Sequence, residues 1–161
     1  MSAPGGLAHL ARRFFGYLRA RPLDPDEQQR VADALPGHLA PLFWAQQAAD
    51  QRHAFDCFAF VTARAPQRPD LAEAALLHDV GKARSRLGVV GRTAASLLAL
   101  AGLARPGRLA SYLDHGPLGA ADLRSAGADP LTVAFAAGHH GPCPEQFDTA
   151  DWELLRAADA A

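Results

Sequence analysis

The chain has 161 residues, of which 49% are hydrophobic, and its 16 basic and 17 acidic residues give a formal net charge of −1. This length and apolar content suit one domain with one core, and they exclude a disordered chain. The near-neutral charge gives no strong nucleic-acid signal, because a domain that binds phosphate backbones is usually clearly basic.

The sequence also bears on cellular compartment and on membrane association. The two cysteines, Cys57 and Cys143, are not a close pair, so neither a disulfide framework nor a thiolate zinc site is expected and a cytoplasmic location is predicted. The N-terminus lacks the basic start and long apolar core of a secretory signal. The most apolar stretch, residues 93–104, is shorter than the roughly 20 residues of a transmembrane helix.

Apolar residues at helical spacing divide the chain into helices, and alternating strand patterns are almost absent. Asp24, Asp70 and Asp129 are expected N-caps, whereas Gly81 and Gly127 are expected to end helices, Gly81 in the left-handed conformation. We predict a single all-α domain over residues 1–161. Its expected helices are 6–20, 25–35, 41–64, 70–79, 89–104, 109–114, 118–126, 131–137 and 149–158.

One stretch, AALLHDVGK at residues 74–82, combines an apolar helix with possible metal ligands. Leu76 and Leu77 belong to the buried face, so His78 and Asp79 are expected to point inward at the edge of the core. Lys82 follows directly after the glycine. A histidine and a carboxylate at such a place suggest a metal site.

Further histidines recur at wide intervals. Of the seven, His9 and His38 are interpreted as surface residues. The other five lie on four separate predicted helices or helix ends, with His139 and His140 at the same end, and Asp159 shares a face with apolar residues of the last helix. These candidate ligands are His53, His78, Asp79, His115, His139, His140 and Asp159.

Imidazole and carboxylate together suit borderline divalent ions: iron, manganese, cobalt, nickel or zinc. The candidates are too many for one tetrahedral ion, so two divalent metals bridged by a carboxylate would be the economical arrangement. Such metal pairs activate water and stabilise a phosphorus centre under attack. The spacing alone is equally compatible with side chains scattered over five helices.

The order of these residues resembles the HD-domain superfamily of metal-dependent phosphohydrolases. HDVGK is similar to its HD-hydrophobic-Gly-Lys signature, and HGPLGAADL is similar to its H-P-x-x-G-A-x-x-L element, with Gly116-Pro117 in place of a direct His-Pro. His139-His140 resembles the paired histidines of the branch related to HD-GYP phosphodiesterases. The resemblance covers roughly residues 42–161 and leaves 1–40 as an N-terminal helical extension.

The resemblance implies a compact helical bundle with two metals in a central cleft. The first metal would be held by His53, His78, Asp79 and Asp159. Asp79 would bridge to a second metal, which would be held by His115 and by His139, His140 or both. The implied activity is hydrolysis of a phosphomonoester or phosphodiester, in a nucleotide or other small phosphorylated compound, by a metal-bound hydroxide.

Asp79 and Lys82 are the expected catalytic residues, with Lys82 reaching a substrate phosphate. No acidic residue occurs between Val80 and Leu113, while Lys82, Arg84 and Arg86 all do. This basic segment could guide the substrate toward the metals. It is equally compatible with ordinary solvated arginines.

The sequence departs from the pattern of related enzymes at two places, and these departures limit the expected number of metals and the expected substrate. The segment after the paired histidines reads GPCPEQF, without the acidic and Gly-Tyr-Pro pattern of cyclic-di-GMP enzymes, and Ala49 stands where three-metal members carry a glutamate. We therefore expect two metals and a different substrate. Two alternatives stay open: a diiron oxygenase of the myo-inositol oxygenase type, which uses the same ligand frame, and a non-catalytic metal-binding signalling module.

Overall fold

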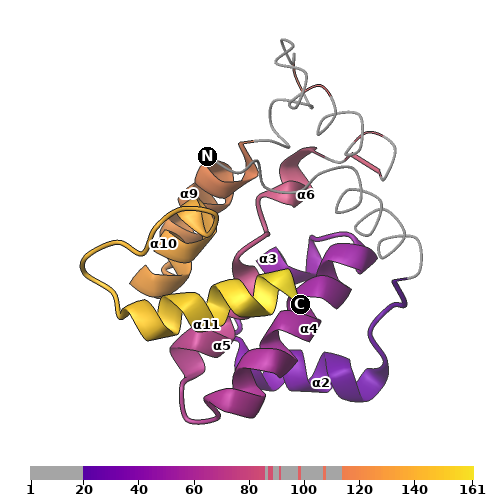
Figure 1. Cartoon of the computed structure of the whole chain (residues 1–161). Helices are drawn as coiled ribbons and strands as arrows, with labels where there is room; N and C mark the ends of the chain where they lie inside the picture. Colours follow the sequence, from indigo (N-terminus) through magenta and orange to yellow (C-terminus); the bar gives the residue numbers. More distant parts are fainter. Residues whose placement is uncertain (1–19, 86, 89–90, 92–97, 99–106, 108–113) are drawn as a thin grey trace.

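A computed structural model describes residues 20–85, 87, 88, 91, 98, 107 and 114–161 (Figure 1). Within these residues every regular element is a helix, and the predicted all-α fold is confirmed. None of the described helices is both long and apolar enough to cross a bilayer. The predicted helices 6–20, 89–104 and 109–114 lie outside the described residues, apart from the single residues Ala20, Gly91, Leu98 and Asp114.

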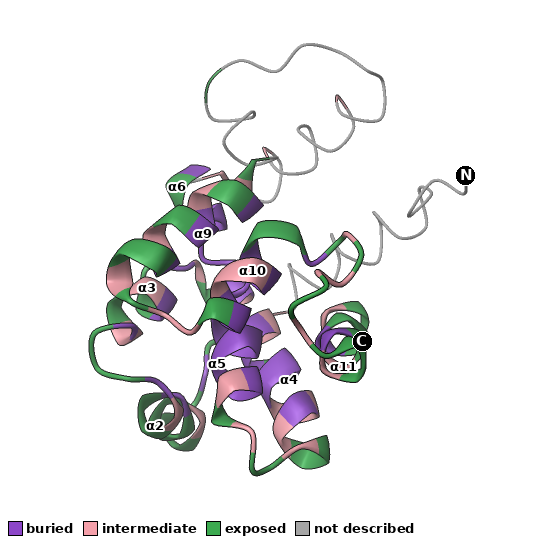
Figure 2. Cartoon of the chain, turned by 90° about the vertical axis from the view of Figure 1, so that its left-hand side faces the viewer, coloured by how far each residue is buried: buried purple, intermediate pink, exposed green. Residues whose placement is uncertain are grey.

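The central element is α5 (Pro69–Leu77), which is buried at every position from Leu71 to Leu77 (Figure 2). A helix that is apolar on all sides must be covered on all sides. It packs against α4 (Ala48–Arg64), α10 (Pro130–Gly138), α11 (Thr149–Ala160), α2 (Pro25–Ala34) and α3 (Ala40–Trp44). Residues 78–82 follow directly after this buried helix, so this segment begins in the interior of the protein.

A second layer lies beyond the end of α5. Here α9 (His115–Ala126) packs along α10, and the short α6 (Lys82–Ser85) contacts α9 (Figure 1). Phe135 of α10 and Trp152 of α11 meet edge to face, with ring centroids 5.1 Å apart, and both are fully buried. This contact joins the second layer to the helices around α5.

Several helix boundaries agree with the predictions. Asp24 caps α2 in a reciprocal capping box with Glu27. Asp129 accepts a hydrogen bond from the backbone N–H of Leu131 at the start of α10. Gly127 ends α9 in the left-handed conformation, with φ of 76°. These boundaries depend on neighbouring residues alone, which is why the sequence reveals them.

Other boundaries were predicted wrongly. The single helix expected over 41–64 is two helices, α3 and α4, because Gln47 is extended, with ψ of 152°. Phe43 and Ala54 are both fully buried. They are 11 residues apart, about three helical turns, so the apolar stripe stays in phase and gives no sign of the break. Asp70 is not a cap: Arg68 is the N-cap of α5 and pairs with Asp70.

The expected helix 118–126 begins earlier, at His115, with Asp114 as its N-cap. At the other end of the chain, α11 continues to Ala160, two residues beyond the predicted end. Both differences are extensions of predicted helices, and they agree with the expected positions of His115 at a helix start and of Asp159 on the last helix. His115 becomes the first residue of α9, and Asp159 lies within α11.

Gly81 has a different role from the one predicted. Among the described glycines only Gly107 and Gly127 have positive φ, so Gly81 is not a left-handed helix end. A Cβ atom at Gly81 would lie 1.9 Å from the His115 carbonyl oxygen and 2.6 Å from the Gly119 nitrogen. The missing side chain therefore lets the backbone of α9 touch the turn after Asp79.

Candidate metal centre

The seven predicted ligands gather in two neighbouring clusters at the centre of the helices. In each cluster the candidate ligand atoms all lie within 4.8 Å of one another. The first cluster consists of His53, His78, Asp79 and Asp159. The second cluster consists of His115, His139 and His140. The structure thus brings together all seven residues, although metal ligation by them stays a prediction.

The first cluster joins three helices through short contacts. The Nε2 atom of His53, on α4, lies 3.1 Å from Oδ1 of Asp159, on α11. The Nε2 atom of His78, at the end of α5, lies 3.5 Å from the same oxygen. This convergence requires the packing of α4 and α11 on α5, which no local sequence pattern specifies.

Asp79 lies between the two clusters. Its Oδ2 atom is 3.4 Å from Nε2 of His78, whereas its Oδ1 atom is 3.3 Å from Nε2 of His115 in the second cluster. The side chain is 1% exposed, and Oδ1 has no hydrogen-bond partner among the described residues. Each carboxylate oxygen thus faces a different cluster, which is the placement that a bridging ligand needs.

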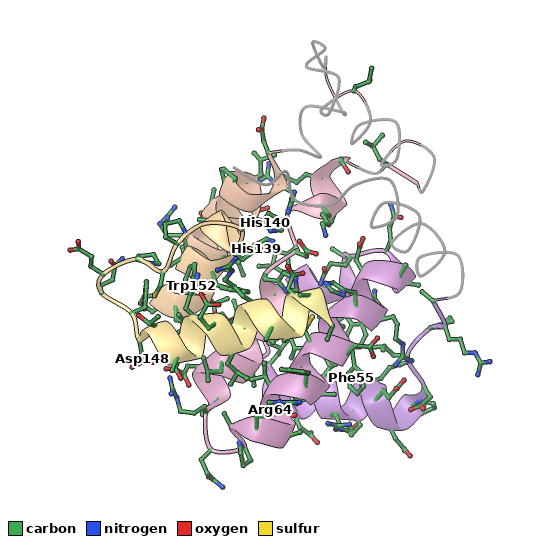
Figure 3. All side chains as sticks on the ribbon, viewed as in Figure 1. Phe55, Arg64, His139, His140, Asp148 and Trp152 are labelled. Carbon is green, nitrogen blue, oxygen red and sulfur yellow. The ribbon has the colours of Figure 1, made fainter. Side chains whose placement is uncertain are left out.

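The second cluster is formed where α9 meets the C-terminal end of α10, and Figure 3 labels two of its members, His139 and His140. His139 is buried, while His140 is exposed. His115 owes its position beside Asp79 to the close contact between Gly81 and α9. The cluster therefore has a buried side at His139 and an open side at His140.

Two ring orientations are fixed by backbone carbonyls. Nδ1 of His78 lies 3.0 Å from the Ala75 oxygen, and Nδ1 of His139 lies 3.2 Å from the Phe135 oxygen. Because a carbonyl only accepts, each Nδ1 carries the hydrogen and each neutral ring has its lone pair on Nε2. Metal-binding histidines typically have this second hydrogen bond. The Nε2 atom of His78 is also buried without a hydrogen-bond partner among the described residues.

The first cluster contains two ionised carboxylates beside protonated groups. Burial opposes the charge of Asp79 and Asp159, but Lys82 and His78 hold the pKa of Asp79 well below its usual value, and His53 and His78 do the same for Asp159. Although burial lowers the pKa of His78, the two carboxylates raise it to about 10. Without a metal, His78 therefore keeps a proton that compensates the carboxylates.

The second cluster has the opposite character. Burial, together with the positive charge of His78, lowers the pKa of His139 to about 3. Burial also lowers the pKa of His140. Both imidazoles are neutral at physiological pH and can donate a lone pair. The imidazoles and carboxylates of the two clusters therefore fit divalent metal ions, and the buried Oδ1 of Asp79 and Nε2 of His78 have no hydrogen-bond partner among the described residues.

The predicted phosphate-binding cations have other contacts. Lys82 is 5% exposed, and its Nζ atom pairs with Oδ2 of Asp79. Arg84 is exposed and pairs with Asp122 of α9, with Nε 2.8 Å from Oδ2. Arg86 lies outside the described residues. Contact of Lys82, Arg84 or Arg86 with a substrate stays a prediction.

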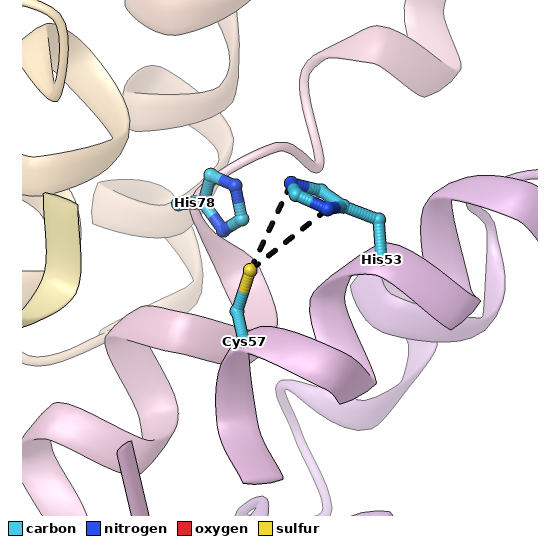
Figure 4. Close-up of side chains that lie close together, drawn as sticks. All are labelled: His53, Cys57 and His78. Carbon is cyan, nitrogen blue, oxygen red and sulfur yellow. Dashed lines mark hydrogen bonds between the residues drawn. The ribbon is translucent and has the colours of Figure 1, made fainter. Parts of the chain in front are cut away.

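Cys57 is the site residue that the sequence analysis missed. Its Sγ atom lies 3.7 Å from Nε2 of His53, and Cys57, His53 and His78 form a third group of closely spaced donors (Figure 4). Cys57 is one helical turn after His53, so the i, i+4 spacing on α4 was the available signal. His38 is exposed, as predicted, and His9 lies outside the described residues.

Residues 37–160 match the family described as the HD domain of Cas3. The match includes all seven candidate ligands and confirms the resemblance to HD domains. No curated protein and no solved structure matches the chain.

Proposed function

The chain belongs to the family of Cas3 HD domains, within the superfamily of metal-dependent hydrolases, and we propose that it is a two-metal phosphodiesterase acting on nucleic-acid strands. HD domains of Cas3 typically act on nucleic acids, which supports this substrate class. The observation that carries the two-metal proposal is Asp79, whose two carboxylate oxygens face different donor clusters.

The first cluster would hold one ion and the second cluster the other, with Asp79 shared between them. When bound, the pair of ions would supply an activated water nucleophile and stabilise negative charge on phosphorus. Iron, manganese, cobalt, nickel and zinc all suit a set of imidazoles and carboxylates. The chain itself supplies the arrangement of donors.

The protein side chains have distinct roles in this proposal. Lys82 pairs with Asp79 and keeps that buried carboxylate ionised and oriented. The carbonyls of Ala75 and Phe135 orient His78 and His139. His53 is 38% exposed, and His140 is also exposed, so the buried donors have solvent-accessible neighbours in both clusters. A phosphodiester would approach over these exposed imidazoles.

A small phosphorylated compound is the second candidate substrate. The pairing of Lys82 with Asp79 and of Arg84 with Asp122 favours it, because these cations are already compensated by carboxylates. The formal net charge of −1 points the same way. A long polyanion generally needs an uncompensated basic surface.

The test uses metal-stripped protein reloaded with manganese. Substrates are single-stranded and double-stranded oligonucleotides of DNA and RNA, dinucleotides and nucleoside monophosphates. We expect cleavage of oligonucleotides and at least about a hundredfold loss in Asp79→Ala, since even outer-shell changes at metal sites cost about 10–100-fold. Arg156→Ala is the control, because Arg156 pairs only with exposed Glu153 among the described residues.

The same experiment separates the alternatives. Cleavage of dinucleotides or monophosphates without cleavage of strands would support the small substrate. Activity only with iron, accompanied by oxygen consumption, would support the oxygenase. Metal binding without turnover of any substrate would support a signalling module and overturn the proposed activity.

A further inference from the structure

Cys57 has contacts on two sides that the proposed hydrolysis does not use. Cys57 is 2% exposed, and its Sγ atom lies 3.7 Å from Nε2 and 4.0 Å from Nδ1 of His53 (Figure 4). On its other side the thiol donates to the Ala158 carbonyl, at 3.4 Å. Ala158 directly precedes Asp159, so Cys57 lies against two elements of the first cluster.

A second observation points to a ligand at this place. His78 is 1% exposed, and its Nε2 atom has no hydrogen-bond partner among the described residues. One ring nitrogen of His78 lies within 4.8 Å of the Cys57 Sγ atom and of a His53 ring nitrogen. The thiol is therefore not alone: two imidazoles, one of them with an unsatisfied buried atom, surround the same small volume.

The spacing agrees with metal coordination. Bonds of about 2.3 Å to sulfur and about 2.0–2.1 Å to nitrogen, at a tetrahedral angle, place the two donor atoms about 3.6 Å apart. The observed distance from Cys57 Sγ to His53 Nε2 is 3.7 Å. The i, i+4 position of the two residues on α4 maintains this distance, and His78 supplies a third donor from another element.

We propose that His53, Cys57 and His78 form an alternative site for a thiophilic ion such as zinc or cadmium. Binding forms a metal–sulfur bond and metal–nitrogen bonds, breaks the S–H bond and releases the thiol proton, together with the proton that His78 holds without a metal, to solvent, with no change of oxidation state. This inference rests on the metal centre proposed above, but it does not depend on hydrolysis.

The alternative site competes with the first cluster because the two share His53 and His78. An ion that prefers oxygen, such as manganese, is held by those imidazoles with Asp79 and Asp159. An ion that prefers sulfur is held by the same imidazoles with Cys57. The centre therefore binds hard and soft divalent ions through different ligands. A thiophilic ion in the alternative site is not bound by Asp79, the carboxylate that connects the two clusters.

Cys57→Ser is the decisive variant. A serine hydroxyl can still donate to the Ala158 carbonyl, so the packing role of the thiol is largely kept while the soft ligand is lost. Cys143→Ser is the matched control, because the Cys143 thiol donates to carbonyls of the loop before α11 and belongs to none of the donor groups.

The experiment is titration of the metal-stripped full chain with cadmium and with cobalt, followed by ultraviolet absorption. We expect a thiolate-to-metal charge-transfer band in the parent and in Cys143→Ser, and no such band in Cys57→Ser. Cadmium affinity should fall at least about tenfold in Cys57→Ser, while manganese affinity changes less than about twofold. X-ray absorption of the zinc-loaded parent should show one sulfur neighbour.

Three results would overturn the proposal: no thiolate band in the parent, a band that persists in Cys57→Ser, or a zinc ion with only nitrogen and oxygen neighbours. Each result concerns coordination alone. A protein that binds zinc through sulfur but cleaves no substrate would refute the proposed activity and leave this inference standing. A protein that cleaves its substrate but does not bind zinc through sulfur would refute only the thiolate site.

Discussion

The first cluster combines two imidazoles with two carboxylates, whereas the second contains imidazoles alone. In the first, the carboxylates raise the pKa of His78 to about 10 although its burial opposes this. In the second, burial lowers the pKa of His139 to about 3. The first cluster thus attracts cations by its own charge, while the second depends on the Oδ1 atom of Asp79 for a negative ligand.

The two clusters are also positioned by different means. Side-chain packing of α4, α5 and α11 places His53, His78 and Asp159. Backbone contact at Gly81 places His115, because α9 approaches closer than a side chain allows. We therefore infer that the first cluster binds its ion more tightly and that the second fills only when Asp79 is in place.

The largest expected effect comes from Asp79→Ala, which removes the residue shared by both clusters. Both ions should be lost, and activity should fall at least about a hundredfold. The change also leaves the 5%-exposed Lys82 without its carboxylate. Breaking such a buried pair costs about 3–5 kcal/mol of unfolding free energy. Metal analysis and chemical denaturation measure the two effects, and a variant that keeps both ions would contradict the bridge.

A comparison of His78→Ala with His140→Ala separates the clusters. His78 is buried between two carboxylates, so its loss should weaken binding of the tighter ion by about 10–100-fold. His140 is exposed, so its loss should weaken only the second ion, and by a smaller factor. Titration calorimetry with manganese gives both affinities. Equal effects of the two substitutions on one ion would argue against two separate clusters.

Gly81→Ala should damage the second cluster selectively. The new Cβ would meet the His115 carbonyl at 1.9 Å, so α9 must move away from Asp79. Overpacking of this kind costs about 1–3 kcal/mol. We expect loss of the second ion and retention of the first. Gly37→Ala is the control, because a Cβ there has no atom within 4 Å. Retention of both ions in Gly81→Ala would disprove the positioning role.

The smallest expected effect is a change in the number of protons that are released when the first metal binds. Because the pKa of His78 is raised to about 10, a metal binding near pH 7.5 must displace its proton. Calorimetry in buffers of different ionisation enthalpy should show about one proton released by the first ion in the parent, and close to none in His78→Ala. An equal count in both proteins would place the released proton elsewhere.

The same pKa governs the metal-free protein. The folded pKa of His78 is above its ordinary value of 6.5, so the stability from this proton is complete below pH 6.5. It is lost as the pH rises through about 10. Thermal unfolding of the metal-free chain should show this decline, which bound metal removes. A flat profile over this range would contradict the protonated state of His78.

The predictability of the site differs from residue to residue. The ligand order could be predicted, because His78-Asp79, His115 and His139-His140 lie in recognisable local motifs. The role of Cys57 could not, because one cysteine on an apolar face has many possible neighbours. Its contact with Ala158 joins residues 101 positions apart, and only the packing of α11 on α4 creates it.

The sequence by itself determined the helical class, the caps at Asp24 and Asp129 and the identity of the seven candidate ligands, since these depend on residue type and local spacing. Tertiary structure decided the rest. It divided the ligands into two clusters, turned the oxygens of Asp79 toward different neighbours and made Gly81 a backbone contact. Distances between helices arise from packing, and no local pattern encodes them.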